Sequence, residues 1–303
     1  MKEPELLRAL TKDEAAYQKR QERRRRKLER AIVRNLHIYK DVTLTDLLNM
    51  ATYEDLEALE DLRTEHAAEM SAIINGTEDD DARAEARKVQ QAGEELIRDR
   101  GPRRLDIAGA AALLPLIVFY ASGAADMTTH LKRVAARSID AAQKKAAEKH
   151  IQPAPEPVKV DPDAIIKETV LTPWKDKKGF TTRMITRMGA NKERILTDLG
   201  QRLARGDSYD SITDDMAKII GKKSEADCYK LIYTEGTHAL NEASARVFEA
   251  EGEERYKIST VGDKRVCPIC LDLEDQEFEF KYRIPGANFP PLHTCCRCSF
   301  EVL

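Results

Sequence analysis

A cluster of metal-binding residue types constrains the C-terminal end of the chain. Five of the six cysteines lie after residue 266, in the patterns Cys267-Pro268-Ile269-Cys270 and Cys295-Cys296-Arg297-Cys298. A C-x-x-C turn brings two thiolates to one zinc ion at about 2.3 Å, and a second pair from a distant turn completes the tetrahedron. No continuous apolar stretch opens the chain, so we expect a reducing cytosol, where metal binding is favoured over disulfides.

The cluster offers more donors than one tetrahedral ion takes. Cys296 and Cys298 point to the same face of an extended chain and could bind together, whereas His293 could replace one of them. A catalytic zinc keeps an open position with a nearby base, as in deaminases with a His-x-Glu motif, and this sequence has no such motif. We therefore predict a structural zinc with these candidate ligands: Cys267, Cys270, His293, Cys296 and Cys298.

Charge is segregated along the first third of the chain, although the formal net charge of the whole is only −3. Residues 1–40 carry 13 Lys or Arg and 6 Asp or Glu, whereas residues 41–100 carry 6 and 17. The run from Lys19 to Arg30 is basic all round a predicted helix. Two interpretations stay open: this surface meets phosphates or an acidic protein, or it pairs with the acidic segment that follows.

Residues 107–125 carry no charge, and about 20 residues is the length of a membrane-spanning helix. Gly109, Pro115 and Gly123 interrupt this stretch, and basic residues flank it on both sides. These features favour the buried central helix of a bundle. A membrane segment, including one that inserts only conditionally, is the alternative.

The rest of the pattern divides the chain near a proline-rich segment. Residues 151–163 hold four prolines and predict an extended linker. We therefore predict a helical, charge-segregated N-terminal domain at residues 1–150, the linker at 151–163, and a C-terminal domain at 164–303.

Helical spacing and capping signals place the elements within these domains. Thr52 and Asp55 resemble a capping box, and the acidic run from Glu78 to Asp81 indicates an exposed loop or a helix start. Alternation after Gly252 predicts three short strands. The predicted fold class is mainly α with a small α+β C-terminal domain whose short strands are stabilised by zinc. The helices are expected over residues 2–37, 43–73, 128–149, 191–205, 211–220 and 224–250, with a Ser224-x-x-Asp227 capping box opening the last.

One face of the last predicted helix is polar. Thr234, His238 and Asn241 follow the spacing i, i+4, i+7, and Glu235 lies beside them. Glu235-x-x-His238 is half of a di-iron signature, but the sequence has no second copy. We expect these groups to tie the helix to the strands, and catalysis is the alternative role.

Several C-terminal motifs occur in a characteristic order and spacing. On these motifs, residues 195–300 resemble the Mu F-like minor head, or head morphogenesis, proteins of tailed bacteriophages. The motifs are Tyr233-Thr234-Glu235, Asn241-Glu242-Ala243, Asp263-Lys264-Arg265-Val266-Cys267-Pro268-Ile269-Cys270 and Pro290-Pro291-Leu292-His293-Thr294-Cys295-Cys296-Arg297-Cys298.

The resemblance implies a non-enzymatic minor component of the phage head. Such a protein is expected to dock on the portal protein, to meet major capsid or scaffold protein, and to act in procapsid assembly, DNA packaging or DNA ejection. Its expected place is the virion, at the portal vertex inside the capsid, after assembly in the host cytoplasm. The basic stretches from Lys19 to Arg30 and from Lys132 to Lys149 could face packaged DNA.

Two other classes of function stay open. A zinc-dependent enzyme acting on nucleic acid would use Glu235, His238 and Asp263 as catalytic residues. A membrane-active ejection protein would use residues 107–125, although the interruptions of that stretch make membrane contact the less favoured interpretation.

Overall fold

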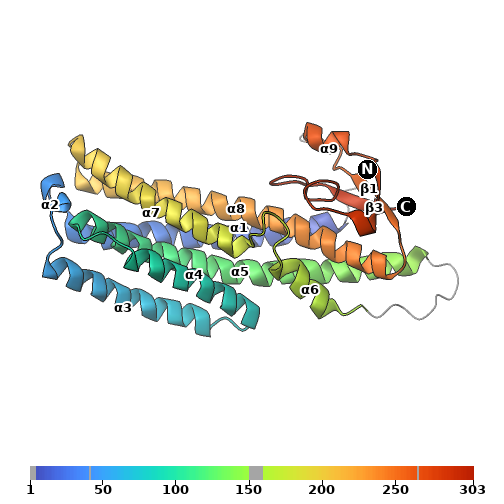
Figure 1. Ribbon diagram of the computed structural model, residues 1–303, viewed down its shortest axis with the longest axis horizontal. Helices are drawn as coiled ribbons and strands as arrows, with labels where there is room; N and C mark the ends of the chain where they lie inside the picture. Colours follow the sequence, from blue (N-terminus) through green and yellow to red (C-terminus); the bar gives the residue numbers. More distant parts are fainter. Residues whose placement is uncertain (1–4, 41, 150–159, 265) are drawn as a thin grey trace. The chain divides into compact units, whose positions relative to one another are not determined.

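The computed structural model describes residues 5–40, 42–149, 160–264 and 266–303, and it is mainly helical (Figure 1). A small antiparallel sheet follows the last long helix, as the sequence predicts. The described helices are α1 (Glu5–Leu36), α2 (Leu44–Leu48), α3 (Tyr53–Asn75), α4 (Asp80–Arg98), α5 (Arg104–Lys149), α6 (Pro162–Leu171), α7 (Phe180–Ala204), α8 (Tyr209–Ala250) and α9 (Pro268–Asp272), with 3-10 turns at His37–Tyr39 and Phe280–Tyr282. The strands are β1 (Arg255–Ser259), β2 (Glu277–Glu279) and β3 (Ser299–Val302).

The chain forms two compact units that are interleaved along the sequence. The first, here called the helical unit, comprises Tyr17–Met127 and Thr181–Cys228. The second, here called the C-terminal unit, comprises Met1–Ala16, Thr128–Phe180 and Tyr229–Leu303. Residues 151–159 of the predicted linker lie outside the described residues, so the predicted domain boundary stays a prediction.

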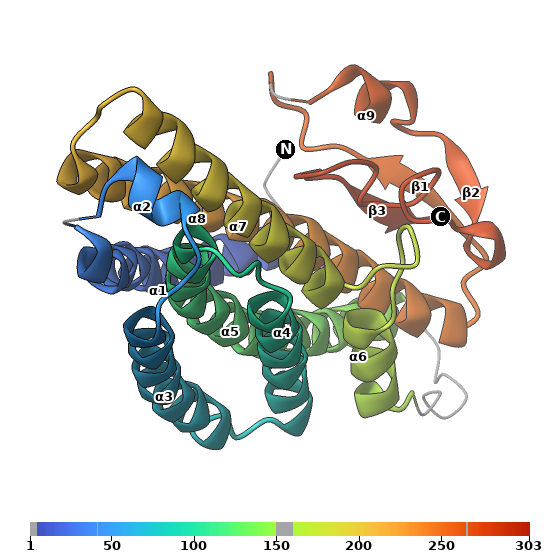
Figure 2. The same cartoon turned by 60° about the vertical axis from the view of Figure 1, so that its left-hand side comes forward.

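Two successive capping boxes start the second and third helices of the helical unit. Thr43 and Asp46 cap α2, and Thr52 and Asp55 cap α3, which confirms the predicted box. Each pair satisfies two backbone amides that a helix start leaves without partners. The acidic run starts a helix, because Asp79 caps α4. Figures 1 and 2 show α3 and α4 running side by side.

The uncharged stretch at 107–125 lies within α5, and all of its residues except Ser122 are buried. Among the described residues, α5 is the one helix long and apolar enough to cross a membrane, with a mean hydropathy of 1.9 over its best window. However, 94% of that window is buried inside the protein. This burial favours the core-helix interpretation of residues 107–125.

Two glycines allow α5 to approach its neighbours closely. A methyl group added at Gly109 would lie 2.2 Å from Cδ2 of Leu196 on α7. A methyl group added at Gly93 on α4 would lie 2.4 Å from Cγ1 of Ile117 on α5. Both distances are far below van der Waals contact, so a larger residue at either position would require the Leu196 or Ile117 side chain to move.

The proline inside α5 is compensated by a side chain from α1. Pro115 has no amide hydrogen, so the carbonyl of Ala111 loses its usual helical donor. Nδ2 of the fully buried Asn35 donates to that carbonyl at 2.9 Å and lies 3.1 Å from Nε2 of His66 on α3. Burial lowers the pKa of His66, which favours the neutral ring that can accept this hydrogen bond. The network joins α1, α3 and α5 through buried polar groups.

The basic run of α1 is partly neutralised within the helical unit. Arg20 and Arg24 both pair with Asp126, and Lys27 pairs with Glu69. Further along the helix Arg34 pairs with Glu65, at 3.3 Å. Pairing with the acidic segment at residues 41–100, one of the two interpretations of the run from Lys19 to Arg30, is therefore found for Lys27.

The structure corrects three predicted helix limits, the first being the start expected at residue 128, which lies inside the continuous α5. The helix predicted at 191–205 starts at Phe180 instead, and α8 is continuous from Tyr209 to Ala250. The predicted capping box at Ser224 is therefore wrong. Ser224 is fully buried within α8, and its hydroxyl accepts from Nδ2 of Asn191 on α7 at 3.1 Å. A tertiary partner, rather than a helix end, explains this serine.

The three strands form a sheet in the order β2-β1-β3, with all pairs antiparallel. Tyr256 and Ile258 of the central strand are fully buried. The ring of Tyr256 packs within 6 Å of Phe280, Phe289 and Phe300. These rings give the short strands a small aromatic core.

Replacing Asn35 by Leu should leave the Ala111 carbonyl buried without a donor. We expect Asn35→Leu to lower the free energy of unfolding by about 1–3 kcal/mol, measured by urea denaturation. In a Pro115→Ala background the amide of residue 115 can donate to that carbonyl, so the same substitution should cost less. An equal cost in both backgrounds would show that Asn35 does not compensate for the proline.

Candidate metal centre

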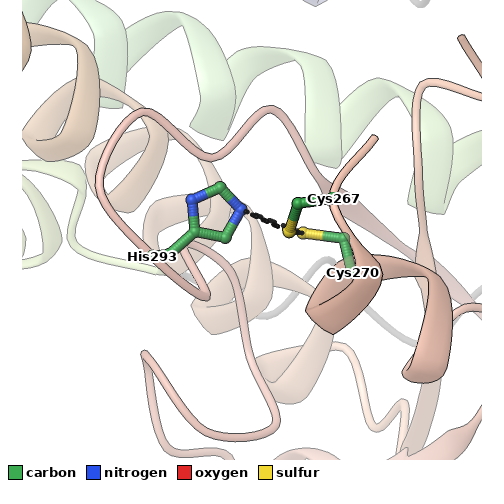
Figure 3. A group of neighbouring side chains, drawn as sticks. All are labelled: Cys267, Cys270 and His293. Atoms are coloured by element: carbon green, nitrogen blue, oxygen red, sulfur yellow. Dashed lines mark hydrogen bonds between the residues drawn. The ribbon is translucent and has the colours of Figure 1, made fainter. Parts of the chain in front are cut away.

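The first three candidate ligands meet beside a short helical turn. Cys267 lies at the N-cap of α9, Pro268 is its first residue, and Cys270 lies one turn further. This turn places the two Sγ atoms 3.5 Å apart. Figure 3 shows the His293 ring pointing at both thiols, with Nε2 at 3.2 Å from Sγ of Cys267 and 3.1 Å from Sγ of Cys270.

A second group shares one cysteine with the first. The donor atoms of Cys270, Cys296 and Cys298 all lie within 4.8 Å of one another, and all three residues are buried. Sγ of Cys270 lies 3.9 Å from Sγ of Cys296. In a tetrahedral zinc site neighbouring sulfurs are about 3.8 Å apart and a sulfur and a nitrogen about 3.6 Å apart. The five candidate residues therefore form two groups of three donors that share Cys270, and Nε2 of His293 lies closer to the two thiols than in an ideal zinc site.

Cys295, the cysteine of the C-terminal cluster that is not a candidate ligand, belongs to neither group. Its backbone is in the left-handed region, with φ of 58°, and this turn separates it from Cys296. All six cysteines are free thiols, so none of the described residues forms a disulfide.

The thiols differ in their electrostatic environment. Burial raises the pKa of Cys270 to about 12. A hydrogen bond from Cys298 lowers the pKa of Cys296 to about 5, while the same contact raises the pKa of Cys298. The contact between these two buried thiols therefore favours ionisation of Cys296 over ionisation of Cys298.

The polar face of α8 holds the segment that carries the last cysteines. Oγ1 of Thr234 accepts from the amide of Cys295 at 3.0 Å. The hydroxyl of Thr237 donates to the carbonyl of Cys296 at 2.9 Å, and Nδ2 of Asn241 donates to the carbonyl of Cys298 at 3.3 Å. The prediction that this face ties the helix to the C-terminal strands is confirmed for Thr234 and Asn241. Thr237 was not among the predicted residues, although it lies three residues after Thr234 and four before Asn241, on the same helix face.

Glu235 and His238 instead hold the loop after α6. Nε1 of Trp174 donates to Oε2 of Glu235 at 2.7 Å, and the Trp174 ring stacks on His238 with centroids 4.7 Å apart. Both residues of α8 are buried. Glu235 and His238 thus both contact Trp174, the single tryptophan of the chain. The sequence around them did not indicate this partner.

Two arginine contacts connect further parts of the C-terminal unit. Arg297 binds Asp263 through two nitrogens, at 2.6 and 2.7 Å, and so joins the segment before Cys267 to the last cysteine segment. Arg283 binds Glu242 of α8 at 3.0 and 3.1 Å. Burial would raise the pKa of Glu242, but the hydrogen bond and charge of Arg283 hold that pKa below its ordinary value. Asp263, the third residue of the catalytic alternative, is therefore engaged by Arg297.

A hollow in the C-terminal unit lies next to the Trp174 and His238 stack and has a volume of about 380 Å³. Three glutamates and three basic residues line it, so opposite charges balance within its wall. Two of these pairs, Arg283 with Glu249 and Arg246 with Glu168, close across it. Because most of the charged side chains that line the cavity pair with one another, the cavity shows no preference for a cation or an anion.

The comparison with known families bears on the same region. Residues 193–301 match the family model described as Phage Mu protein F like protein. The resemblance of the C-terminal region is confirmed. This Mu F-like region includes α8, the strands and all five candidate ligands, and its family is one of bacteriophage head morphogenesis proteins. No curated protein and no solved structure matches the chain significantly.

Thr234→Val should weaken the attachment of the Cys295 segment to α8. The substitution keeps the shape of the side chain but removes the acceptor for the Cys295 amide. We expect a loss of about 1 kcal/mol in the free energy of unfolding and faster hydrogen exchange at that amide, measured by NMR.

Thr186→Val is the matched control. Thr186 makes the same bond to the carbonyl four residues earlier as Thr234 does, but its side chain is exposed. Unchanged exchange of the Cys295 amide in Thr234→Val would contradict the attachment.

Proposed function

We propose that the protein is a minor head protein of a tailed bacteriophage that docks on the portal inside the head. The match of residues 193–301 to the Phage Mu protein F like family is the observation that carries this proposal. In this role the chain acts in procapsid assembly, DNA packaging or DNA ejection, and contacts portal protein and major capsid or scaffold protein. It lies at the portal vertex of the virion after assembly in the host cytoplasm.

We propose further that a structural zinc ion closes the Mu F-like region. Cys267 and Cys270 supply two ligands, and two of His293, Cys296 and Cys298 supply the others. The distances and the thiolate-rich donor set support zinc. When bound, the ion would cross-link the α9 turn to the segment after β2, adding to the hydrogen bonds from α8.

The role proposed is an assembly role rather than catalysis. Trp174 donates a hydrogen bond to Glu235 and stacks on His238, and Arg297 binds Asp263. These contacts support structural roles for all three residues. Such contacts supply rigidity to a docking module.

Packaged DNA is a further proposed contact. Arg133, Lys144 and Lys145 are exposed on the second half of α5, within the stretch from Lys132 to Lys149. On α1, ion pairs reduce the charge that the stretch from Lys19 to Arg30 can offer to phosphates. Contact through the α5 stretch would weaken with rising salt.

Metal analysis tests the zinc proposal. We expect about one zinc per chain in the purified protein, lost in Cys267→Ser and in Cys270→Ser. Removal of the metal with a chelator should lower the melting temperature of the wild-type protein. Cys295→Ser is the matched control and should keep the ion. A folded wild-type protein without metal would refute the proposal.

Phage assembly tests the head function. Mass spectrometry of purified virions should detect the chain, and a cryo-EM map of the portal vertex should contain its long helices. A phage lacking the chain should give fewer infectious particles. Virions that lack the protein while particle yield is unaffected would refute the function.

A further inference from the structure

An apolar and acidic surface covers α2 and the start of α3. Four large apolar side chains are exposed there within nine positions, Leu48 at 47%, Met50 at 67%, Tyr53 at 76% and Leu56 at 42%. Single exposed apolar residues are ordinary, but a cluster on one segment is typical of an interaction site. We call Leu48, Met50, Tyr53, Leu56, Glu57 and Asp61 the α2–α3 surface.

The backbone under this surface is fixed. The amide of Ala51 donates to the carbonyl of Pro102 at 2.9 Å, and the amide of Arg104 donates to the carbonyl of Asn49 at 3.0 Å. The side chain of Arg104 also binds Asp55, the capping residue of α3, at 2.8 Å. Met50 and Tyr53 are therefore displayed on an anchored frame, which lowers the entropy lost when a partner binds.

The charged residues of the α2–α3 surface are acidic, and the exposed Arg103, which pairs with Met50 in an isolated β-bridge, lies at its border. Residues 42–62 contain no Lys or Arg, while Glu54, Glu57 and Asp61 are exposed along the outer side of α3. Within the described chain no ion pair joins Glu57 or Asp61 to a cation. Tyr53, Leu56, Glu57 and Asp61 follow helical spacing from the first turn of α3 onward, so apolar and acidic groups share one face.

The complementary partner carries an apolar surface flanked by Lys or Arg. Arg is favoured opposite such a surface, because its stem covers apolar area and its guanidinium can stack on Tyr53 or pair with carboxylates. An anionic membrane or nucleic acid is disfavoured by the same charges. A protein partner is therefore the occupant that fits both features.

We infer that the α2–α3 surface is the surface with which this chain docks on the portal protein, through a basic, apolar helical patch of the portal. This inference rests on the proposed function and adds the docking surface and the chemistry of its partner. It places docking on residues outside the Mu F-like region.

The test measures binding of purified full-length chain to the assembled portal of the same phage by surface plasmon resonance. We expect Met50→Ser/Tyr53→Ser to weaken affinity at least about tenfold, and Glu57→Lys/Asp61→Lys to weaken it and to reduce its dependence on salt. Because these side chains are exposed, the melting temperatures of both variants should equal that of the wild type.

The control uses the other prominent exposed apolar pair. Tyr282→Ser/Ile284→Ser removes side chains that are 64% and 61% exposed in the C-terminal unit, and it should bind as the wild type does. Loss of binding in this control alone, or wild-type affinity in both α2–α3 variants, overturns the inference and leaves portal docking intact.

Two further outcomes separate the proposals. If the wild-type chain does not bind the portal, portal docking fails and this assignment fails with it. If light scattering shows a wild-type oligomer that the Met50→Ser/Tyr53→Ser variant cannot form, while portal binding is unchanged, the surface belongs to a second copy of the chain and the inference is overturned.

Discussion

Hydrogen bonds from one helix face to a cysteine-bearing segment are the constraint on which the candidate metal centre depends. Thr234, Thr237 and Asn241 contact the peptide groups of residues 295, 296 and 298 from successive turns of α8. These contacts are made by neutral groups and need no ion. They position Cys296 and Cys298 against the α9 turn, so that metal binding would begin from a partly ordered site.

The same helix organises the rest of the C-terminal unit through charged and aromatic partners. Glu242 accepts a hydrogen bond from Arg283, which lies in the segment after β2. Trp174, from the loop after α6, donates to Glu235 and stacks on His238. Several segments remote in sequence therefore meet on one rigid element.

The sequence predicted what depends on local signals. Alternation at Tyr256, Phe278 and Phe300 located the strands, and Thr52 with Asp55 located the start of α3. The features that escaped depend on tertiary partners. Ser224 resembled a helix cap in the sequence, because Asn191, the side chain that donates to its hydroxyl, comes from another helix.

Long-range compensation was equally hidden. Nothing near Pro115 in the sequence indicates that Asn35 supplies its missing hydrogen bond, and nothing near Asp263 indicates Arg297. The candidate ligands themselves were predictable from spacing, because C-x-x-C and its second half carry their geometry locally. Which four of the five donors would bind the ion cannot be predicted from local sequence, because it depends on how two separate turns approach each other.

The membership of Cys270 in both donor groups has a kinetic consequence. If the proposed zinc ion is bound, a fifth donor would lie beside its four ligands, so one ligand could replace another while the ion stays in the site. Such a site would trade some inertness for ease of loading.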